Sequence, residues 1–462
     1  MQDSDKGPGG FDYYGLPTST IGTVIMVSRL FQLAQMVGLL ILALLLWVGA
    51  VTAVALLTTE KISVTGTDSA SLIDAAKTHS ANHPGNLALV VIDDGRVDGT
   101  HFMSIGRPVD ADTLFQMASV SKWITAWGVM TLAESGKINL DAPASRYLRR
   151  WRLPPTNYDN DQVTVRRLLS HTAGLTDGLG YCGFAPGQPI QKLEASLTAA
   201  ADACLFTDGW VAVGARPGGW QYSGGGFSML QLMIEDVSGQ PFADYMDAAV
   251  LKPLGMQRST FRTRAQGATD VAEFFDSDGS PAQHFSYTAA GAASLYSSAS
   301  DLAQFVNAHR PGSDGAVAGR GVLSPQSLQT MAAPQAMLIG RPHWGLGVRL
   351  YAPSRANGYI IGHDGGNAPA VNTSVRLDPA SGDAIIALST GGTGMASQLA
   401  SAWLRQRVTP ADLPDEGVST FAVLGQVWGM RRWIFGGAVF IVLGGLILIW
   451  RSWRRKGMVV LS

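Results

Sequence analysis

The sequence is poor in charged residues. Only 15% of its 462 residues are Asp, Glu, Lys or Arg, and 34 basic and 35 acidic side chains leave a formal net charge of -1. Because attraction to nucleic acid requires an excess of basic residues, this balance argues against a nucleic-acid partner. The apolar fraction of 46% and the mean hydropathy of +0.14 instead indicate membrane-spanning segments.

The sequence also lacks common signatures of metal and phosphate chemistry. His79 and His83 are four residues apart, but no Glu lies between them as in the zincin motif, and Pro84 follows directly. There is no G-x-S-x-G elbow, which excludes an α/β-hydrolase nucleophile of the usual kind. The run from Gly224 to Gly226 lacks the flanking pattern of a phosphate-binding loop, and we interpret it as a plain backbone turn. No metal or other cofactor is therefore expected.

Cysteine is scarce as well, since Cys182 and Cys204 are the only two in the chain. A disulfide between them would close a loop of about 20 residues and stabilise the fold by roughly 3 kcal/mol on the chain-entropy model. The alternative is two buried, unpaired thiols, because spacing alone does not decide pairing. We predict the disulfide, which requires a location outside the reducing cytoplasm.

Two long apolar runs stand out, one near each end of the chain. The first, MVGLLILALLLWVGAVTAVALL, would form a helix about 33 Å long, and we place a transmembrane helix at residues 30–58. The second, WIFGGAVFIVLGGLILIW at residues 433–450, would reach about 27 Å, with a tryptophan at each membrane interface. Each run is long enough to cross a bilayer.

Basic residues set the expected orientation in the membrane. The second run is followed by four of them, which the positive-inside rule places in the cytoplasm: Arg451, Arg454, Arg455 and Lys456. With two spans, residues 1–29 and 451–462 are cytoplasmic tails, and the domain at residues 65–410 lies on the periplasmic side of the cytoplasmic membrane. The alternative is a cleaved signal peptide, because Ala53-Val54-Ala55 offers a small-residue cleavage site.

Within residues 65–410, strand patterns lie at both ends and helical patterns lie in the middle. NLALVVIDDGRVDGTHFMSIG predicts two strands around the turn DDGR, and AVNTSVRLDPASGDAIIALST predicts two more near the C-terminal end. We therefore predict an α+β fold, in which one antiparallel sheet built from both sequence ends is flanked by helices and carries an inserted, mainly helical lobe.

The stretch FQMASVSKWITAWGVMTLAE carries a serine and a lysine three residues apart. On a helix these positions share a face, with Cβ atoms about 5–6 Å apart, so Ser119 and Lys122 can meet. About one such pair is expected by chance in a chain of this length, and Lys122 would then be a surface charge. The uncharged run after Lys122 favours burial, which could lower its pKa by the roughly three units needed for a base. The alternative base is a tyrosine whose phenolate this lysine favours.

This stretch and three others, in the same order, resemble the beta-lactamase-related serine hydrolases. That group includes class C beta-lactamases, penicillin-binding proteins, D-alanyl-D-alanine carboxypeptidases, D-aminopeptidases and esterases, and the resemblance covers roughly residues 70–410. The first stretch implies Ser119 as the nucleophile, with its backbone N–H in the oxyanion hole, and Lys122 as its partner. The second, VTVRRLLSHTAGL, is similar to a structural helix that ends in a turn.

The other two stretches complete the implied site. WQYSGGGFSMLQLMIEDV resembles the Tyr-x-Asn region of the family and implies Tyr222 as the catalytic tyrosine. GHDGGNAPAVNTSV resembles its Lys-Thr-Gly strand, with His363 in the lysine position and Gly366 as the second oxyanion N–H. Gly224 and Gly365 would line the substrate site. The resemblance thus implies a Ser-Lys-Tyr acyl-enzyme mechanism without a cofactor.

Two departures from the family pattern bear on the substrate. Gly224 stands where an Asn would hold a substrate amide, and His363 replaces a lysine that would hold a substrate carboxylate. A histidine with a pKa near 6.5 is mostly neutral at pH 7. We therefore expect a peptidase, carboxypeptidase or esterase acting on a small molecule or peptide, and not a strong beta-lactamase. The alternative is a membrane sensor or binding protein for cell-wall fragments or beta-lactams that does not turn over.

Overall fold

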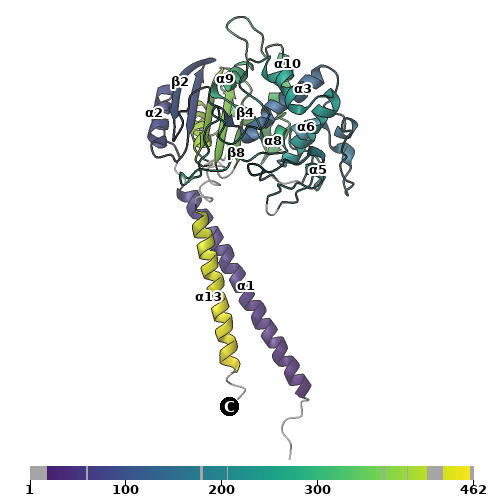
Figure 1. Ribbon diagram of the computed structural model, residues 1–462, viewed down its shortest axis with the longest axis vertical. Coiled ribbons are helices and arrows are strands. Elements are labelled where there is room, and N and C mark those ends of the chain that lie inside the picture. The colour runs from purple at the N-terminus through teal and green to yellow at the C-terminus, as the bar shows by residue number, and fades with distance from the viewer. Residues whose placement is uncertain are drawn as a thin grey trace, which may run out of the picture. The chain divides into compact units, whose positions relative to one another are not determined.

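The computed structural model describes residues 18–58, 61–176, 181–204, 207–367, 370–392, 394–413 and 430–457. The chain divides into two compact units (Figure 1). The first unit combines the terminal segments Met1–Thr58 and Met430–Ser462, and the second is Thr59–Gly429.

The first unit is a pair of helices, α1 (Thr18–Thr58) and α13 (Arg431–Gly457), which contact each other. Glycines of α13 form the contact. A Cβ atom added at Gly437 would collide with the ring of Trp47, and one at Gly445 would come within 2.8 Å of Leu40. Small residues let two apolar helices approach closely, which is the usual way in which helices pair in a bilayer.

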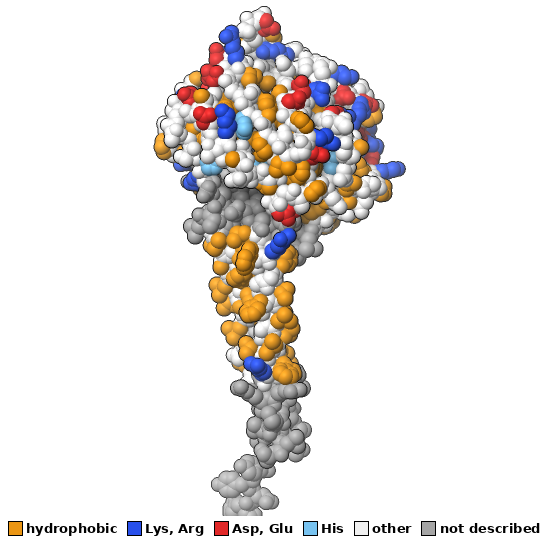
Figure 2. Space-filling model, turned by 60° about the vertical axis from the view of Figure 1, so that its left-hand side comes forward, with side chains coloured by type: hydrophobic (Ala, Val, Ile, Leu, Met, Phe, Trp, Pro, Cys, Tyr) orange, Lys and Arg blue, Asp and Glu red, His pale blue; other side chains and the backbone are white. Residues whose placement is uncertain are grey.

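Both helices contain a stretch that is long and apolar enough to cross a membrane, Leu30–Val54 in α1 and Arg432–Arg451 in α13. Only 6% of the first stretch and none of the second is buried, and apolar side chains cover their visible face in Figure 2. A core helix of a soluble protein would bury such a surface. These stretches match the two apolar runs predicted from the sequence.

The second unit is built on an eight-stranded sheet with the order β2-β1-β10-β9-β8-β7-β6-β5, in which neighbouring strands are antiparallel. The early β1 lies beside the late β10, with Leu87 opposite Ser389. The prediction of one antiparallel sheet built from both sequence ends is therefore confirmed. Its strands are β1 (Leu87–Asp93), β2 (Arg96–Met103), β5 (Ala336–Leu338), β6 (Arg341–Trp344), β7 (Arg349–Pro353), β8 (Tyr359–Asn367), β9 (Val371–Asp378) and β10 (Asp383–Thr390).

Both faces of the central strands of this sheet are buried. Successive side chains of β1 point to opposite faces, and its apolar run LALVVI supplies both of them. One face packs against α2 (Ser69–Ser80) and α11 (Met395–Arg407), and α9 (Ala299–Asn307) contacts β1 and β10 on the face toward the main core. The hairpin from β1 to β2 turns through Asp94 and Gly95, whose φ angles of +44° and +76° suit a two-residue turn.

The helical lobe surrounds α3 (Ser121–Glu134), which is buried on nearly all sides. Trp123 and Trp127 of α3 are fully buried, and the ring of Trp123 lies 4.9 Å from that of Phe305. A helix that is apolar around its circumference belongs in a core. The other elements of the lobe and its borders are β3 (Phe115–Gln116), η1 (Ala118–Val120), η2 (Ala144–Arg146), η3 (Asn160–Gln162), α4 (Val165–Leu169), α5 (Leu193–Thr198), α6 (Gly224–Ser238), α7 (Phe242–Met246), η4 (Asp247–Leu251), α8 (Ala290–Ala293), β4 (Tyr296–Ser297) and α10 (Pro325–Ala332).

The glycine run at residues 224–226 is the first turn of α6, so its interpretation as a plain backbone turn was wrong. The side chain of Ser223 caps this helix by accepting a hydrogen bond of 2.8 Å from the N–H of Gly226. A Cβ atom at Gly226 would lie 3.4 Å from Leu175 and 3.6 Å from Leu168. Capping and close packing thus outweigh the low helix propensity of glycine.

Candidate active site

Ser119 lies in η1, a single turn of 3-10 helix directly before α3. Ala118, the residue before it, has a φ of +46°, a conformation that costs a non-glycine residue about 1–3 kcal/mol. Hydrogen bonds at Met117 hold the turn in place. The N–H of Met117 donates to Leu295 O at 2.7 Å, and its carbonyl accepts from Thr373 Oγ1 at 2.8 Å.

Lys122 reaches back from the first turn of α3 to Ser119. Its Nζ donates to Ser119 Oγ at 3.0 Å and to the carbonyl oxygen of Ala292 at 2.8 Å. The lysine is only 3% exposed, whereas Ser119 is partly exposed. The structure thus places a buried amine against a hydroxyl that solvent can reach, and a neutral amine in this position can accept the hydroxyl proton.

Tyr222 lies beside the lysine, with Lys122 Nζ 5.1 Å from the centre of its ring. His171 positions the tyrosine. Its ring lies 4.3 Å from that of Tyr222, its Nδ1 accepts from Ser223 N–H at 3.1 Å, and its carbonyl accepts from Gln221 N–H at 2.7 Å. Both chain neighbours of Tyr222 are therefore bound to this histidine. Burial, followed by the charge of Lys122, holds the pKa of His171 well below its usual value.

His363 comes from β8 and lies 6.4 Å from Tyr222 between ring centres. Its Nδ1 is 2.7 Å from the carbonyl oxygen of Asp364, and because a carbonyl only accepts, Nδ1 carries the proton. Burial, followed by the charge of Lys122, lowers the pKa of His363 to about 3. The imidazole is thus neutral at physiological pH. It gives the site no positive charge for a carboxylate.

Trp344, at the end of β6, packs with His171, Tyr222 and His363 into a cluster of rings, here called the aromatic wall. The sequence did not suggest this cluster. The Trp344 ring lies 5.3 Å from that of His363, 4.9 Å from His171 and 5.8 Å from Tyr222. In the sequence, Trp344 is simply a tryptophan near the end of a short strand. Such residues are too common to indicate a site. The wall makes this side of the site apolar.

Gly365 of β8 packs against the nucleophile segment. Beyond Gly362, β8 pairs with β9 but no longer with β7. A Cβ atom at Gly365 would collide with Met117 O and lie 3.1 Å from Ser119 N, so only glycine allows this approach. Gly366 follows directly and is partly exposed. The strand thus brings the Gly365–Gly366 backbone beside the backbone N–H of Ser119.

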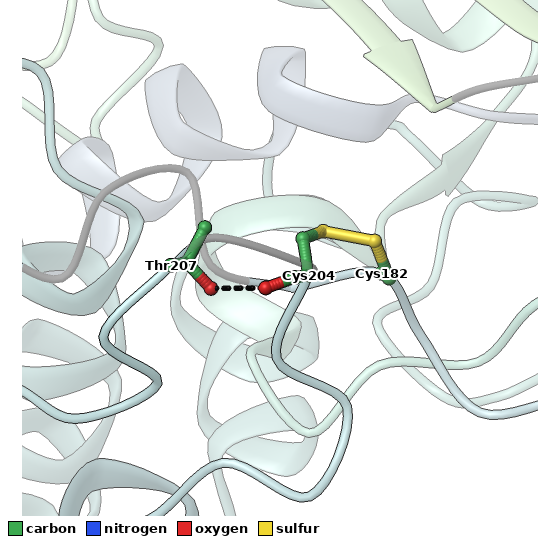
Figure 3. The surroundings of a disulfide bond; sticks show 3 residues. All are labelled: Cys182, Cys204 and Thr207. Carbon is green, nitrogen blue, oxygen red and sulfur yellow. Dashed lines mark hydrogen bonds between the residues drawn. A yellow bond between two sulfur atoms is a disulfide. The ribbon is translucent and has the colours of Figure 1, made fainter. Parts of the chain in front are cut away.

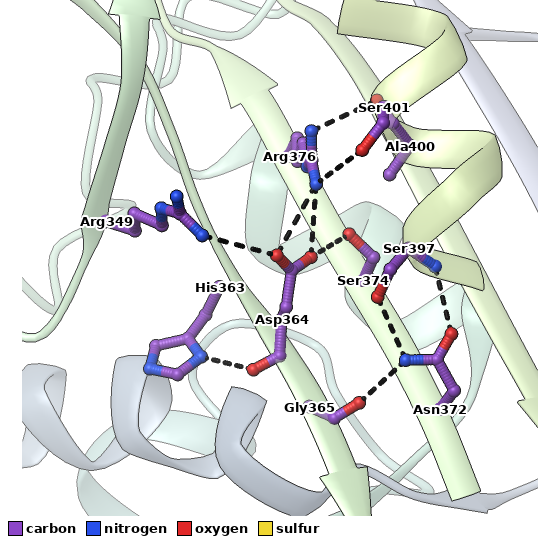
Figure 4. A network of polar contacts seen from close by, with 10 residues as sticks. All are labelled: Arg349, His363, Asp364, Gly365, Asn372, Ser374, Arg376, Ser397, Ala400 and Ser401. Carbon is purple, nitrogen blue, oxygen red and sulfur yellow. Dashed lines mark hydrogen bonds and ion pairs between the residues drawn. The ribbon is translucent and has the colours of Figure 1, made fainter. Parts of the chain in front are cut away.

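A buried ionic network holds the face of β8 that points away from the nucleophile segment, as Figure 4 shows. The carboxylate of Asp364 accepts a hydrogen bond from Ser374 and lies 3.4 Å from Arg376 and 3.9 Å from Arg349. Arg376 is fully buried and also donates to Ala400 O at 3.3 Å in α11. Burial opposes ionisation of Asp364, but the two arginines outweigh it and hold the pKa of the carboxyl below its usual value. Asp364 therefore ties β8 to β9 and α11.

The structure places the predicted site residues on η1, α3, β8, α6 and the segment before α6. Ser119, Lys122, Tyr222, His363 and Gly365 lie together. Gly224 is buried as the first residue of α6, two residues after the tyrosine.

Cys182 and Cys204 form a disulfide (Figure 3) in the loop region between α4 and α6. Residues 177–180 and 205–206 of this region lie outside the described residues. No group of three or more potential metal ligands occurs in the described parts of the chain.

Comparisons with known proteins agree with this geometry. The esterase EstB of Burkholderia gladioli is 36% identical over 177 residues, which cover 36% of this chain and 43% of that protein. A penicillin-binding protein of Bacillus subtilis is 31% identical over 162 residues, which cover 35% of this chain and 34% of that protein. The chain therefore matches less than half of the length of each of these relatives.

Solved structures show the same fold. The octameric penicillin-binding protein homologue from Pyrococcus abyssi superposes with a TM-score of 0.57 at 24% identity, over 75% of this chain and 78% of that one. The D-alanine carboxypeptidase AmpC from Burkholderia cenocepacia superposes with a TM-score of 0.53 at 20% identity, over 73% of this chain and 99% of that one.

A family model described as Beta-lactamase matches residues 73–409, which is most of the chain and nearly all of its second unit. Members of this family are generally hydrolases, and they include esterases and penicillin-binding proteins. The chain belongs to the Beta-lactamase family.

Proposed function

We propose that the protein is a membrane-anchored serine hydrolase that cleaves an amide or ester through an acyl-enzyme formed on Ser119. The observation that carries this proposal is the contact of 3.0 Å between Lys122 Nζ and Ser119 Oγ, with the amine buried and the hydroxyl partly exposed. An arrangement in which a base touches a reachable hydroxyl is the signature of an activated nucleophile.

The proposed reaction has two halves. Ser119 Oγ bonds to the substrate carbonyl carbon while its proton passes to the Lys122–Tyr222 pair, and backbone N–H groups of Ser119 and Gly366 stabilise the oxyanion. The bond from this carbon to the leaving group then breaks, and the leaving group takes up the proton. In the second half a water molecule attacks the carbon of the acyl-enzyme ester and gives a proton to the same pair. The bond from this carbon to Ser119 Oγ then breaks, Oγ takes up that proton, and the acid leaves.

The neutral state of His363 bears on the substrate class. Family members with a lysine in this position use its charge to hold a carboxylate, and here the position holds a neutral imidazole in an aromatic wall. This favours an ester, or an amide without a carboxylate next to the leaving group, and the similarity to an esterase points the same way. The proposed substrate is a small molecule or a peptide derivative.

Pre-steady-state kinetics of the full chain in detergent with a p-nitrophenyl ester test this function. We expect a burst of about one equivalent of p-nitrophenol followed by steady turnover, because an acyl-enzyme forms and is then hydrolysed. Release of one equivalent without further turnover would favour the rival function, a membrane sensor that is acylated and signals. No release at all would contradict both.

We further propose that the chain crosses the cytoplasmic membrane twice and holds the hydrolase unit on the outer side. The apolar stretches of α1 and α13 and the basic residues that follow the second stretch support this topology. A reporter enzyme fused after Ser462 is expected to be active only when it is of a kind that works in the cytoplasm. Activity of a periplasmic reporter, such as alkaline phosphatase, at this position would contradict the two-span topology.

A further inference from the structure

The face of β8 that meets the nucleophile segment carries three side-chain positions. Alternate residues of a strand share a face, so His363, Gly365 and Asn367 point one way and Asp364 points the other way, toward α11. Gly365 sits directly against Ser119 N. His363 and Asn367 therefore flank the nucleophile on opposite sides, each about 7 Å along the strand from Gly365. The family resemblance assigns a role to the first of these side chains and none to the second.

Asn367 is oriented by Gln116, a buried residue three positions before the nucleophile. Gln116 Nε2 donates to Phe285 O at 3.0 Å and to the hydroxyl of Tyr296 at 3.2 Å. Because the carbonyl of Phe285 only accepts, the amide nitrogen of Gln116 is fixed toward it, and the oxygen of Gln116 faces Asn367. That oxygen accepts from Asn367 Nδ2 at 3.0 Å. The nitrogen of Asn367 is thus bound, and its oxygen is on the other side of the amide.

The remaining members of the network make this orientation rigid. Gln116 is 2% exposed and Tyr296 is 1% exposed. The hydroxyl of Tyr296 is in contact with Nε2 of His284, whose pKa burial lowers to about 4, so this imidazole is neutral and can accept the hydroxyl proton. Each donor in the series from Asn367 to His284 meets an acceptor. Rotation of the Asn367 amide by 180° would set Asn367 Oδ1 against Gln116 Oε1, and two acceptors cannot bond to each other.

Asn367 Oδ1 is available at the surface of the site. Asn367 is partly exposed, and its Nδ2 is the side-chain atom that binds the buried Gln116. No described protein group donates to it. A fixed, exposed carbonyl oxygen on one side of the nucleophile is a hydrogen-bond acceptor without a donor, and a substrate group that carries an N–H can supply one.

We propose that Asn367 is a specificity-determining residue that accepts a hydrogen bond from an N–H group in the acyl part of the substrate. The inference rests on the proposed hydrolase function and deepens it. It names the substrate class as esters or amides whose acyl group carries an amide or amine beside the reacting carbonyl, such as an acylated amino acid or a peptide. The asparagine that the family places after its catalytic tyrosine is a glycine here, and Asn367 supplies an amide to the site from a different element.

Two matched esters test the proposal on the full chain in detergent. The p-nitrophenyl esters of N-acetylglycine and of 4-oxopentanoic acid differ only by an NH in place of a CH2. After division by their rates of alkaline hydrolysis, kcat/KM of the wild-type protein should favour the N-acetylglycyl ester by about tenfold, which is the worth of one well-placed hydrogen bond. In Asn367→Leu this preference should disappear, while turnover of the 4-oxopentanoyl ester changes by less than about threefold.

The control is Asn357→Leu, which replaces an exposed asparagine just before the other end of β8 and should keep the tenfold preference. A preference that survives in Asn367→Leu would overturn the proposal. Equal loss of both esters in Asn367→Leu would also overturn it, because Asn367 would then support the strand and not recognise the substrate. If the wild-type protein hydrolyses neither ester and a fluorophosphonate does not label Ser119, the hydrolase function itself has failed.

Discussion

Replacing Ser119 by alanine is expected to abolish labelling by a fluorophosphonate probe and to lower kcat/KM for p-nitrophenyl esters by at least about 10^4-fold. Loss of the nucleophile removes the covalent step entirely, and a comparable replacement in a serine protease costs about 10^6-fold. Ser119 combines partial exposure with the contact of 3.0 Å to Lys122 Nζ. It is therefore a hydroxyl that the substrate and the base can reach together. Fluorescence of the labelled protein on a gel and initial rates of p-nitrophenol release measure the two effects.

The matched control for this variant is Ser135→Ala, at the exposed C-terminal end of the same helix. It removes a hydroxyl that bonds to Leu132 O within its own helix, so labelling and turnover should stay within about twofold of wild type. The thermal midpoint of Ser119→Ala should also stay close to that of wild type, because a small, partly exposed hydroxyl contributes little to stability. Labelling that persists in Ser119→Ala would mean that another residue is the nucleophile.

The fold was largely predictable, because its strands have strong local signals at both sequence ends. The turn at Asp94-Gly95 and the run LALVVI predicted β1 and β2 without further information, and the buried pairing of β1 with β10 follows from apolar residues that cannot face water. The glycine run at residues 224–226 was misread because glycine usually marks a turn. Its helix depends on the Ser223 cap and on contact with Leu168 and Leu175, and neither is visible locally.

The site was predictable where a recognisable motif carries it. Ser119 and Lys122 are three residues apart, so helix geometry alone brought them together. Trp344 and His171 meet Tyr222 across more than 50 residues of chain, and only tertiary packing decides such contacts. Residues that work through a network are harder still to predict.

Asp364 and Arg376 illustrate this limit. A strand arginine usually indicates a solvent-facing position, yet Arg376 is fully buried and lies 4.0 Å from the ring of Tyr351. Its burial is possible because Asp364 and carbonyl and hydroxyl groups of α11 surround the guanidinium. The alternation of polar and apolar residues along β9 does not tell a buried arginine from an exposed one.

Replacing Lys122 by methionine is expected to lower kcat/KM by about 10^3-fold or more while Ser119 remains in place. Methionine fills a similar volume in the buried site but cannot accept the serine proton, and general-base catalysis is worth about 10^2 to 10^4 in rate. The change also removes the donor to Ala292 O, which costs about 1–3 kcal/mol of stability because that carbonyl is buried. Thermal unfolding measured beside the kinetics separates these two effects. The control Lys137→Met, at an exposed position just beyond the same helix, should leave both unchanged.

The pH profile of kcat/KM shows whether Lys122 acts as a base. Burial and the charge of Lys122 keep the pKa of His171 well below its usual value and lower that of His363 to about 3, so neither imidazole is expected to gain a proton near pH 7. A base that takes the proton of Ser119 must first be unprotonated, and Lys122→Met tests whether this base depends on the lysine. Activity should fall as the pH falls, and Lys122→Met should lose most of this dependence. A variant that keeps the wild-type profile, or more than a tenth of its activity, would show that the serine is activated without the lysine.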